Sequence, residues 1–331
     1  MKHPKNIKRL AIAGCISVLY MLSSVAAGWG HHGGVYHVAV LTPGLVYEAV
    51  FRGLEEELGR VGYRAGKNIT YMIEDTQGNL SDLGGPAKKL VDAKPHALFT
   101  VGTAYSLAAM QATTTLPIVF ANIADPVRAG LIAGYQSSKN NLTGVATYAG
   151  PLSAKRLEML KEIAPATKRV LMIVSSVEAP RLESVQPVEE AAKKLRIQMV
   201  RREAASKTDI EKILADTPRG SIDAIFHFPS TLVGANIGAL IRKAKEDKIP
   251  LSTGNDDMVA QGALFSYGNN FRLVGIQAAR LMAKVLNGEK PSDLPVEVPD
   301  KFFLTLNTTT AKTIGLKIPL NVLERVDRVV E

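Results

Sequence analysis

Residues 97–110 read ALFTVGTAYSLAAM, in which an apolar run stops at Gly102-Thr103 and a segment of small residues begins at once. This order predicts a strand at 97–101 and a helix at 104–112. The same order of strand, polar corner and helix returns at residues 224–255, which read AIFHFPSTLVGANIGALIRKAKEDKIPLSTGN. The second helix is longer, so the two segments are not a strict repeat, but Thr103 and Thr231 occupy equivalent corners.

Short apolar segments alternate with amphipathic ones around both corners. We expect strands at 35–41, 69–73, 97–101, 117–121, 170–174, 197–200, 222–228 and 249–252, and helices at 46–61, 83–91, 104–112, 157–163, 188–195, 210–214 and 232–245. Continuous apolar strands separated by helices are typical of parallel sheets covered on both faces. Because the pattern pauses at 141–153, the sequence predicts two Rossmann-like, doubly wound α/β lobes. We expect the chain to cross between them at 150–153.

The N-terminal segment has the composition of a secretory signal. Residues 1–9 carry four basic side chains and no acid, and residues 10–27 are almost wholly apolar and end in small residues. We predict a signal peptide at 1–27, which places the folded part in the periplasm or elsewhere outside the cytoplasm. Two alternatives stay open: an uncleaved membrane anchor, because residues 10–30 nearly span a bilayer, and lipidation at Cys15.

The charge of the chain argues against a nucleic-acid partner. The formal net charge is +9, and it falls to about +5 without the four basic residues of the predicted signal. The other basic residues are scattered and are not interleaved with aromatic ones, so they indicate a solvated surface. Since Cys15 is the only cysteine, the exported portion has no disulfide.

No residue pattern points to catalysis, a cofactor or a metal. A G-x-G-x-x-G pattern at 28–33 precedes the first strand instead of following one, so it does not predict a nucleotide site. His31, His32 and His37 have no carboxylate or thiol at metal-ligand spacing. His96 and His227 lie in strand patterns, where we expect packed, hydrogen-bonded side chains. We therefore expect neither an enzyme nor a resident cofactor.

Polar residues at strand ends are the candidate ligand contacts, because open α/β sheets bind ligands there. Thr103 either caps its own helix or, with the N–H groups that follow, binds a carboxylate. Asp125, followed by Pro126, either caps a helix or faces a ligand ammonium. Three tyrosines are candidate walls for an apolar ligand: Tyr105, Tyr148 and Tyr267.

Four segments together resemble one protein family. They read EELGRVGYRAGKNITYMIEDTQGN (56–79), PIVFANIADPVRAGLI (117–132), NNLTGVATYAGPLSAKRLEMLKEIAPATKRV (140–170) and ALFSYGNNFRLVGIQAARLMAKVLNGEKPSDLPVEVPDKFFLTLNTTTAKTIGLKIP (263–319). These residues resemble the ABC transporter substrate-binding proteins of the tryptophan/tyrosine type, a branch of the type I periplasmic binding proteins. The resemblance extends from residue 35 to residue 331.

The resemblance implies a receptor that closes on a small solute and delivers it to a membrane permease. Its two lobes are joined by a three-crossing hinge, with lobe 1 at 35–150 plus a return segment at about 268–303. Lobe 2 is then 151–267 plus a C-terminal segment at about 304–331. The expected solute is an amino acid, aromatic or branched, and the expected state is a monomer.

The same resemblance places Thr42, Thr103, Ala104, Asp125, Ser230 and Thr231 at positions that bind ligand in the family. With Tyr267 as a candidate wall and Asn255 from the next strand end, these are the expected ligand-binding residues. The second corner departs from the family pattern, because Pro229-Ser230-Thr231 stands where Pro-Ser-Asp is common. We expect Asn255, Asp256 or Asp257 to replace that charge, or the solute to be uncharged, such as a nucleobase or sugar. Two further alternatives are the sensing domain of a signalling receptor and an enzyme that uses the same cleft.

Overall fold

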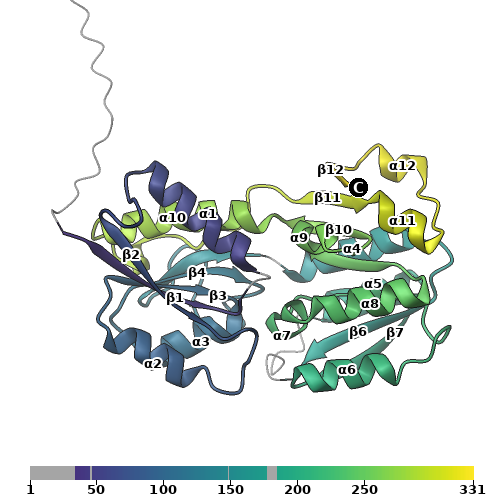
Figure 1. Ribbon diagram of the computed structural model, residues 1–331, viewed down its shortest axis with the longest axis horizontal. Coiled ribbons are helices and arrows are strands. Elements are labelled where there is room, and N and C mark those ends of the chain that lie inside the picture. Colours follow the sequence, from purple (N-terminus) through teal and green to yellow (C-terminus); the bar gives the residue numbers. More distant parts are fainter. Residues whose placement is uncertain (1–33, 45–46, 148, 177–184) are drawn as a thin grey trace, which may run out of the picture.

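The computed structural model describes residues 34–44, 47–147, 149–176 and 185–331, which form two α/β lobes (Figure 1). The predicted signal peptide, Cys15 and Tyr148 lie outside the described residues. Within those ranges, no helix is both long and apolar enough to cross a membrane. Each lobe is built on its own sheet with helices on both faces, which confirms the predicted fold class.

The first lobe contains a five-stranded parallel sheet in the order β2-β1-β3-β4-β5. Its central strand is buried at every residue, because it has a strand on each side and helices on both faces. The last strand falls where the sequence pattern pauses, since Thr143 and Gly144 interrupt its apolar run. The strands are β1 (Tyr36–Thr42), β2 (Ile69–Asp75), β3 (Ala97–Val101), β4 (Ile118–Ile123) and β5 (Leu142–Ala146).

Four helices cover this sheet: α1 (Glu48–Arg60) and α10 (Phe271–Leu286) on one face, and α2 (Gly84–Asp92) and α3 (Thr103–Ala112) on the other. Helices α1 and α10 meet through Gly53 and Gly275. A Cβ on Gly53 would collide with the backbone of Arg272, and one on Gly275 with the backbone of Val50. Because of this close approach, α10 packs on the first lobe although it comes late in the sequence.

The second lobe contains a seven-stranded sheet in the order β12-β11-β10-β9-β8-β6-β7, in which only the β10–β11 pair is antiparallel. Its strands are β6 (Arg169–Ser175), β7 (Gln198–Ala204), β8 (Ala224–Phe226), β9 (Leu251–Asn255), β10 (Phe265–Asn269), β11 (Phe303–Asn307) and β12 (Arg328–Val330).

Helices also cover both faces of the second sheet. Helices α4 (Ala149–Ile163) and α5 (Gln186–Lys194) pack on one face, and α6 (Lys207–Ala215), α7 (Thr231–Ala235) and α8 (Ile237–Asp247) on the other. The single helix predicted at 232–245 is wrong. It breaks at Asn236, whose side chain donates a hydrogen bond to the carbonyl of Leu232 and so competes with the helix backbone. Three short helices complete the lobe: α9 (Asp256–Ala260), α11 (Thr308–Ile314) and α12 (Leu320–Leu323).

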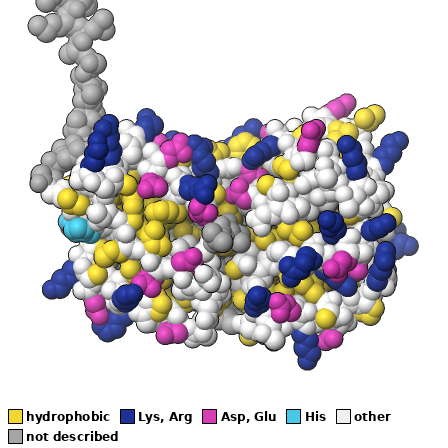
Figure 2. Space-filling view, viewed as in Figure 1, with side chains coloured by type: hydrophobic (Ala, Val, Ile, Leu, Met, Phe, Trp, Pro, Cys, Tyr) yellow, Lys and Arg dark blue, Asp and Glu magenta, His cyan; other side chains and the backbone are white. Residues whose placement is uncertain are grey.

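Three connections join the lobes. The chain passes from β5 to α4, from β10 to α10, and from the 3₁₀ helix η3 (Pro291–Asp293) to β11. Parallel connections of this kind allow one lobe to rotate against the other. On the face shown in Figure 2, basic side chains are dispersed and interleaved with acidic ones, as the sequence indicates.

Candidate functional site

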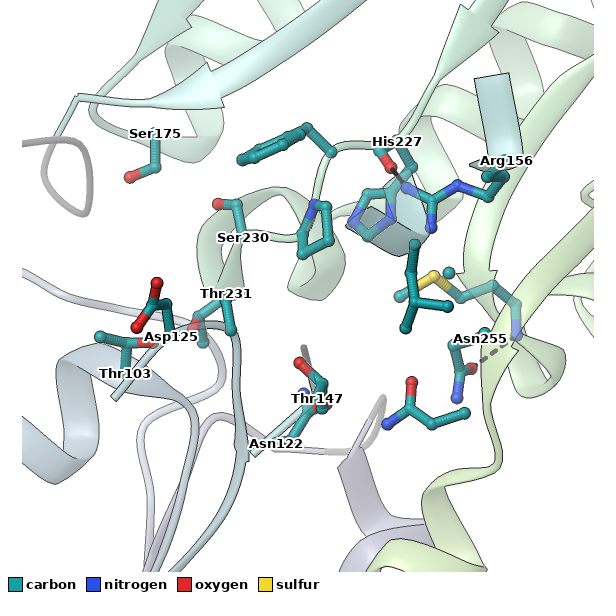
Figure 3. Close-up of a pocket in the computed structure, with 18 of the residues that line it drawn as sticks. Thr103, Asn122, Asp125, Thr147, Arg156, Ser175, His227, Ser230, Thr231 and Asn255 are labelled. Atoms are coloured by element: carbon teal, nitrogen blue, oxygen red, sulfur yellow. Dashed lines mark hydrogen bonds between the residues drawn. The ribbon is translucent and has the colours of Figure 1, made fainter. Parts of the chain in front are cut away.

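A cleft lies between the lobes and contains about 1210 Å³ of space that protein atoms do not fill, part of it open to solvent. Its walls come from the segments that follow β3, β4 and β5 of the first sheet and β6, β8, β9 and β10 of the second. Both sheets therefore present their carboxyl ends to one space, as expected for this topology. Figure 3 shows Thr103 and Asp125 at one end of the cleft and Arg156 and His227 at another.

The two corners predicted from the sequence meet across the cleft. A Cβ on Gly102 would lie 2.9 Å from Oγ1 of Thr231, so the turn before α3 contacts the first residue of α7. Gly102 is the N-cap of α3, with φ of 91° and no side-chain cap, and Thr103 is the first helical residue. Thr103 therefore does not cap its helix. In the second lobe, Ser230 caps α7 by accepting a hydrogen bond from the Val233 N–H at 3.2 Å.

Asp125 lies on the cleft wall and also stabilises its own loop. One carboxylate oxygen accepts a hydrogen bond from the Arg128 N–H at 3.0 Å, and the other lies 3.2 Å from Nε of Arg128. Residues 126–130 form a turn, so the helix start suggested by Asp125-Pro126 is wrong. The capping interaction itself is present, because an Asp side chain can accept a hydrogen bond from a backbone N–H in a turn, as it does at the start of a helix.

Aromatic side chains form an apolar wall on the first-lobe side. Tyr47 stacks on Phe271 with ring centroids 5.0 Å apart and an interplanar angle of 26°, and both line the cleft. Tyr267, in β10 of the second lobe, also lines the cleft. Tyr105 does not, because it is fully buried in the first lobe with its hydroxyl 2.6 Å from Oγ1 of Thr76.

Two of the predicted contacts lie away from the lining. The hydroxyl of Thr42 accepts a weak hydrogen bond from the Gly44 N–H at 3.5 Å, and Ala104 packs against the cluster beneath α2 and α3. The residues that the structure brings together at the cleft are Thr103, Asp125, Ser230, Thr231, Asn255 and Tyr267.

Of the three candidates for a replacement charge, only Asn255 lines the cleft. Asp256 accepts hydrogen bonds from Asn270 and Arg328, at 2.6 and 2.9 Å, and burial raises the pKa of Asp257. Asn255 caps α9 through Oδ1, which accepts from the Met258 N–H at 3.2 Å. Its Nδ2 is buried and has no hydrogen-bond partner among the described residues.

The sequence prediction missed Arg156, which lines the second-lobe wall. The sequence did contain a signal for it, namely a charged residue on the buried face of an amphipathic helix. That face of α4 consists of Ser153, Arg156, Leu157 and Leu160. Nη2 of Arg156 donates to the carbonyl of His227 at 2.7 Å. Burial lowers the pKa of Arg156 to about 9, so the side chain is still cationic at neutral pH.

His227 departs from the expectation of a hydrogen-bonded strand residue. It is buried at the end of β8 on the cleft wall, and neither ring nitrogen has a hydrogen-bond partner in the described part of the chain. Burial, with a smaller contribution from the nearby cation of Arg156, lowers the pKa of His227 to about 3. The imidazole is therefore neutral at pH 7 and offers one donor and one acceptor. Among the described residues, no group of His, Cys, Asp or Glu side chains is arranged to hold a metal ion.

A family model for the ABC transporter substrate binding protein matches residues 37–330. A tyrosine-binding protein of Clostridioides difficile (strain R20291) is 26% identical over 267 residues, which cover 80% of this chain and 76% of that protein. The match spans both lobes, including both corners of the cleft.

Two solved structures are similar to this chain in fold. A domain from Streptococcus pneumonia in complex with L-Trp has a TM-score of 0.83 at 22% identity, covering 90% of this chain and 100% of that one. A ligand-free, open structure of a substrate-binding protein with adhesive properties from Clostridium difficile has a TM-score of 0.63 at 25% identity, covering 90% of this chain and 99% of that one.

Proposed function

The chain belongs to the ABC transporter substrate-binding protein family, and from this premise we propose that it binds a small solute, an aromatic or branched amino acid, between its lobes. As a member of a binding-protein family, it is not an enzyme. The amino-acid class is supported by the relatives, one named for tyrosine binding and another in complex with L-Trp. The stacked Tyr47–Phe271 pair provides an apolar surface suited to such a side chain.

The observation that carries this proposal is the contact between the two corners. Gly102 of the first lobe and Thr231 of the second touch beside the cleft, which is the arrangement of lobes closed around a space. A second closing contact lies nearby, because a Cβ on Gly234 would come within 2.6 Å of the Tyr47 hydroxyl oxygen. A solute that fills the space between these contacts stabilises the closed state over the open one.

We propose that rotation about the three connections opens and closes the cleft. In this proposal lobe 1 comprises 35–150 with about 268–303, and lobe 2 comprises 151–267 with about 304–331. Solute contacts come from Thr103, Asp125, Ser230, Thr231, Asn255 and Tyr267, which line the cleft. The protein acts as a monomer outside the cytoplasm, after export by residues 1–27, and presents its solute to permease subunits in the membrane.

A thermal-shift screen against amino acids, nucleobases, sugars and small carboxylates tests this function. A solute at a hundred times its dissociation constant adds about 2.7 kcal/mol to the free energy of unfolding, which is a readily measured shift. We expect the largest shifts from aromatic or branched amino acids. Stabilisation by sugars or nucleobases alone would move the proposal to uncharged solutes, and turnover of any solute would contradict a binding role.

A further inference from the structure

Arg156 is a buried cation that has no ionic partner among the residues that the structure describes. The side chain is 1% exposed, and none of the described carboxylates lies within salt-bridge distance of its guanidinium. Its Nη2 donates to the carbonyl of His227 at 2.7 Å and lies 3.4 Å from Oγ of Ser153, while Nε has no partner. The guanidinium carbon lies 4.6 Å from the centroid of the Phe226 ring, which attracts the cation but does not neutralise it.

The surrounding backbone keeps space for this guanidinium. Gly254, near the end of β9, faces Nη1 of Arg156, and a Cβ there would come within 2.8 Å of that nitrogen. Both Gly254 and Arg156 line the cleft, and Figure 3 shows the guanidinium projecting toward its interior. The second-lobe wall is therefore built to hold a charged group at the edge of the solute space.

Two neighbouring side chains also have unused polar groups. Within the described ranges, His227 has no hydrogen-bond partner at either ring nitrogen, and Asn255 has none at Nδ2. Among the described residues that line the cleft, the one carboxylate is that of Asp125, which lies away from Arg156 in Figure 3 and is paired with Arg128. Burying a charge beside unsatisfied donors costs free energy unless a partner binds to them. A solute that enters the cleft can be that partner.

We propose that the solute carries an anionic group, a carboxylate for an amino acid, and that Arg156 is its charge partner, with His227 and Asn255 supplying hydrogen bonds. The inference rests on the proposed function, because it specifies how that same cleft recognises its solute. It assigns the negative end of the solute to the second lobe. The N-terminus of α3, in the first lobe, then contacts the solute only through groups that carry no formal charge.

A purely structural role for Arg156 is the alternative to exclude. In that case the side chain only supports the carbonyl of His227 and packs on Phe226. Replacing Arg156 would then change stability, but it would not change how strongly the protein distinguishes a carboxylate from a carboxamide. A double-mutant cycle between the protein charge and the solute charge separates these two roles.

The experiment measures dissociation constants by calorimetry for the wild type, Arg156→Lys and Arg156→Gln. The probes are matched pairs, L-tyrosine with L-tyrosinamide and L-tryptophan with L-tryptophanamide, together with benzoate as a carboxylate without an amine. We expect the amide to bind the wild type about 30-fold more weakly than the acid, because hydrogen bonds to charged groups are among the stronger ones. In Arg156→Gln the amide is expected to bind less than about threefold more weakly than the acid. In Arg156→Lys this ratio is expected to lie between the two values.

Lys155→Gln is the matched control, because Lys155 precedes Arg156 on α4 but pairs at the surface with Glu158 at 2.9 Å. It is expected to keep the wild-type preference for the acid. Melting of each variant without solute verifies that it folds. The inference is overturned if acid and amide differ equally in the wild type and Arg156→Gln.

Failure of this inference is distinguishable from failure of the proposed function. If uncharged solutes bind and no carboxylate does, the cleft binds solutes but Arg156 has no anionic partner. If neither amino acid binds but benzoate stabilises the wild type and not Arg156→Gln, the amino-acid class is wrong and the anion site stands. If no probe binds more tightly to the wild type than to Arg156→Gln, the anion site is rejected.

Discussion

The corners of the two lobes occupy equivalent places in their sheets but are completed differently. In the first lobe, α3 begins at Gly102 without a side-chain cap, and Thr103 is left on the cleft wall. In the second lobe, Ser230 caps α7. Arg156 and His227, which have buried polar atoms without partners among the described residues, also line the cleft there. Topology fixes where strands end, whereas the residues placed there decide which lobe presents an uncapped helix start and which buries a charged side chain.

This difference has an energetic consequence. The first-lobe wall has its carboxylate paired with Arg128 at the rim, where solvent screens both charges. The second-lobe wall buries a guanidinium and an imidazole whose polar atoms are incompletely satisfied. Such an arrangement lowers the stability of the solute-free protein, so the second lobe is the one that a bound solute should stabilise more.

The largest test of this asymmetry is the acid sensitivity of His227. Its pKa is about 3 in the folded chain against an ordinary value of 6.5, so between these values the unfolded chain binds a proton that the folded chain does not. Stability therefore falls as pH drops from 6.5 toward 3, by about 1.4 kcal/mol per unit from this group. We expect His227→Gln to show a shallower loss over that range in urea unfolding.

The matched variant is His96→Gln, whose side chain is exposed on the first lobe. The stability of each variant is subtracted from that of the wild type at every pH. This difference removes the contribution of the carboxylates, which also titrate in acid. A wild-type curve parallel to that of His227→Gln down to pH 4 would contradict a buried, neutral imidazole in the second lobe.

A second test alters the first corner through Gly102→Ala. The backbone there has φ of 91° and ψ of 159°, a conformation that is essentially restricted to glycine and costs other residues about 1–3 kcal/mol. The new Cβ would also lie 2.9 Å from Oγ1 of Thr231 and so oppose closure. We expect a lower melting temperature and at least about tenfold weaker binding of the best solute of the screen.

Gly59→Ala is the control for this substitution. Gly59 lies in α1 with nothing near its Cβ position, so alanine is expected to stabilise the helix by roughly 0.5–1 kcal/mol without changing affinity. Unchanged affinity in Gly102→Ala would show that the two corners need not touch when solute is bound.

The sequence predicted the fold well, because the fold depends on patterns that are local and repeated. The run ALFTV is continuously apolar because β3 is buried on both sides, and the Gly-Thr corner follows from the end of that run. Strand β5 was missed since Thr143 and Gly144 interrupt its hydrophobic pattern. The break at Asn236 was missed because it arises from one side chain that competes with the helix backbone.

The site was predicted only in part, because its residues are brought together by tertiary structure. Thr103, Asp125 and Thr231 follow strands and could be found from topology alone. Tyr47 and Phe271 are far apart in sequence and become a wall only when α10 packs on α1. Arg156 lies in the middle of an amphipathic helix, and its charge on the buried face was the one available signal.

The smallest and most direct test compares the Gly102-Thr103 corner with the Ser230-Thr231 corner. Ser230→Ala removes the hydrogen bond to the Val233 N–H and is expected to cost about 1 kcal/mol of stability. Thr103 makes no such cap, so Thr103→Ala is expected to change stability by less than about 0.5 kcal/mol and to weaken solute binding roughly two- to tenfold. Urea unfolding without solute and calorimetry with the best solute of the screen measure the two effects separately. If Thr103→Ala lost as much stability as Ser230→Ala and bound solute normally, the first corner would serve its own helix, and the difference between the lobes would be one of capping chemistry alone.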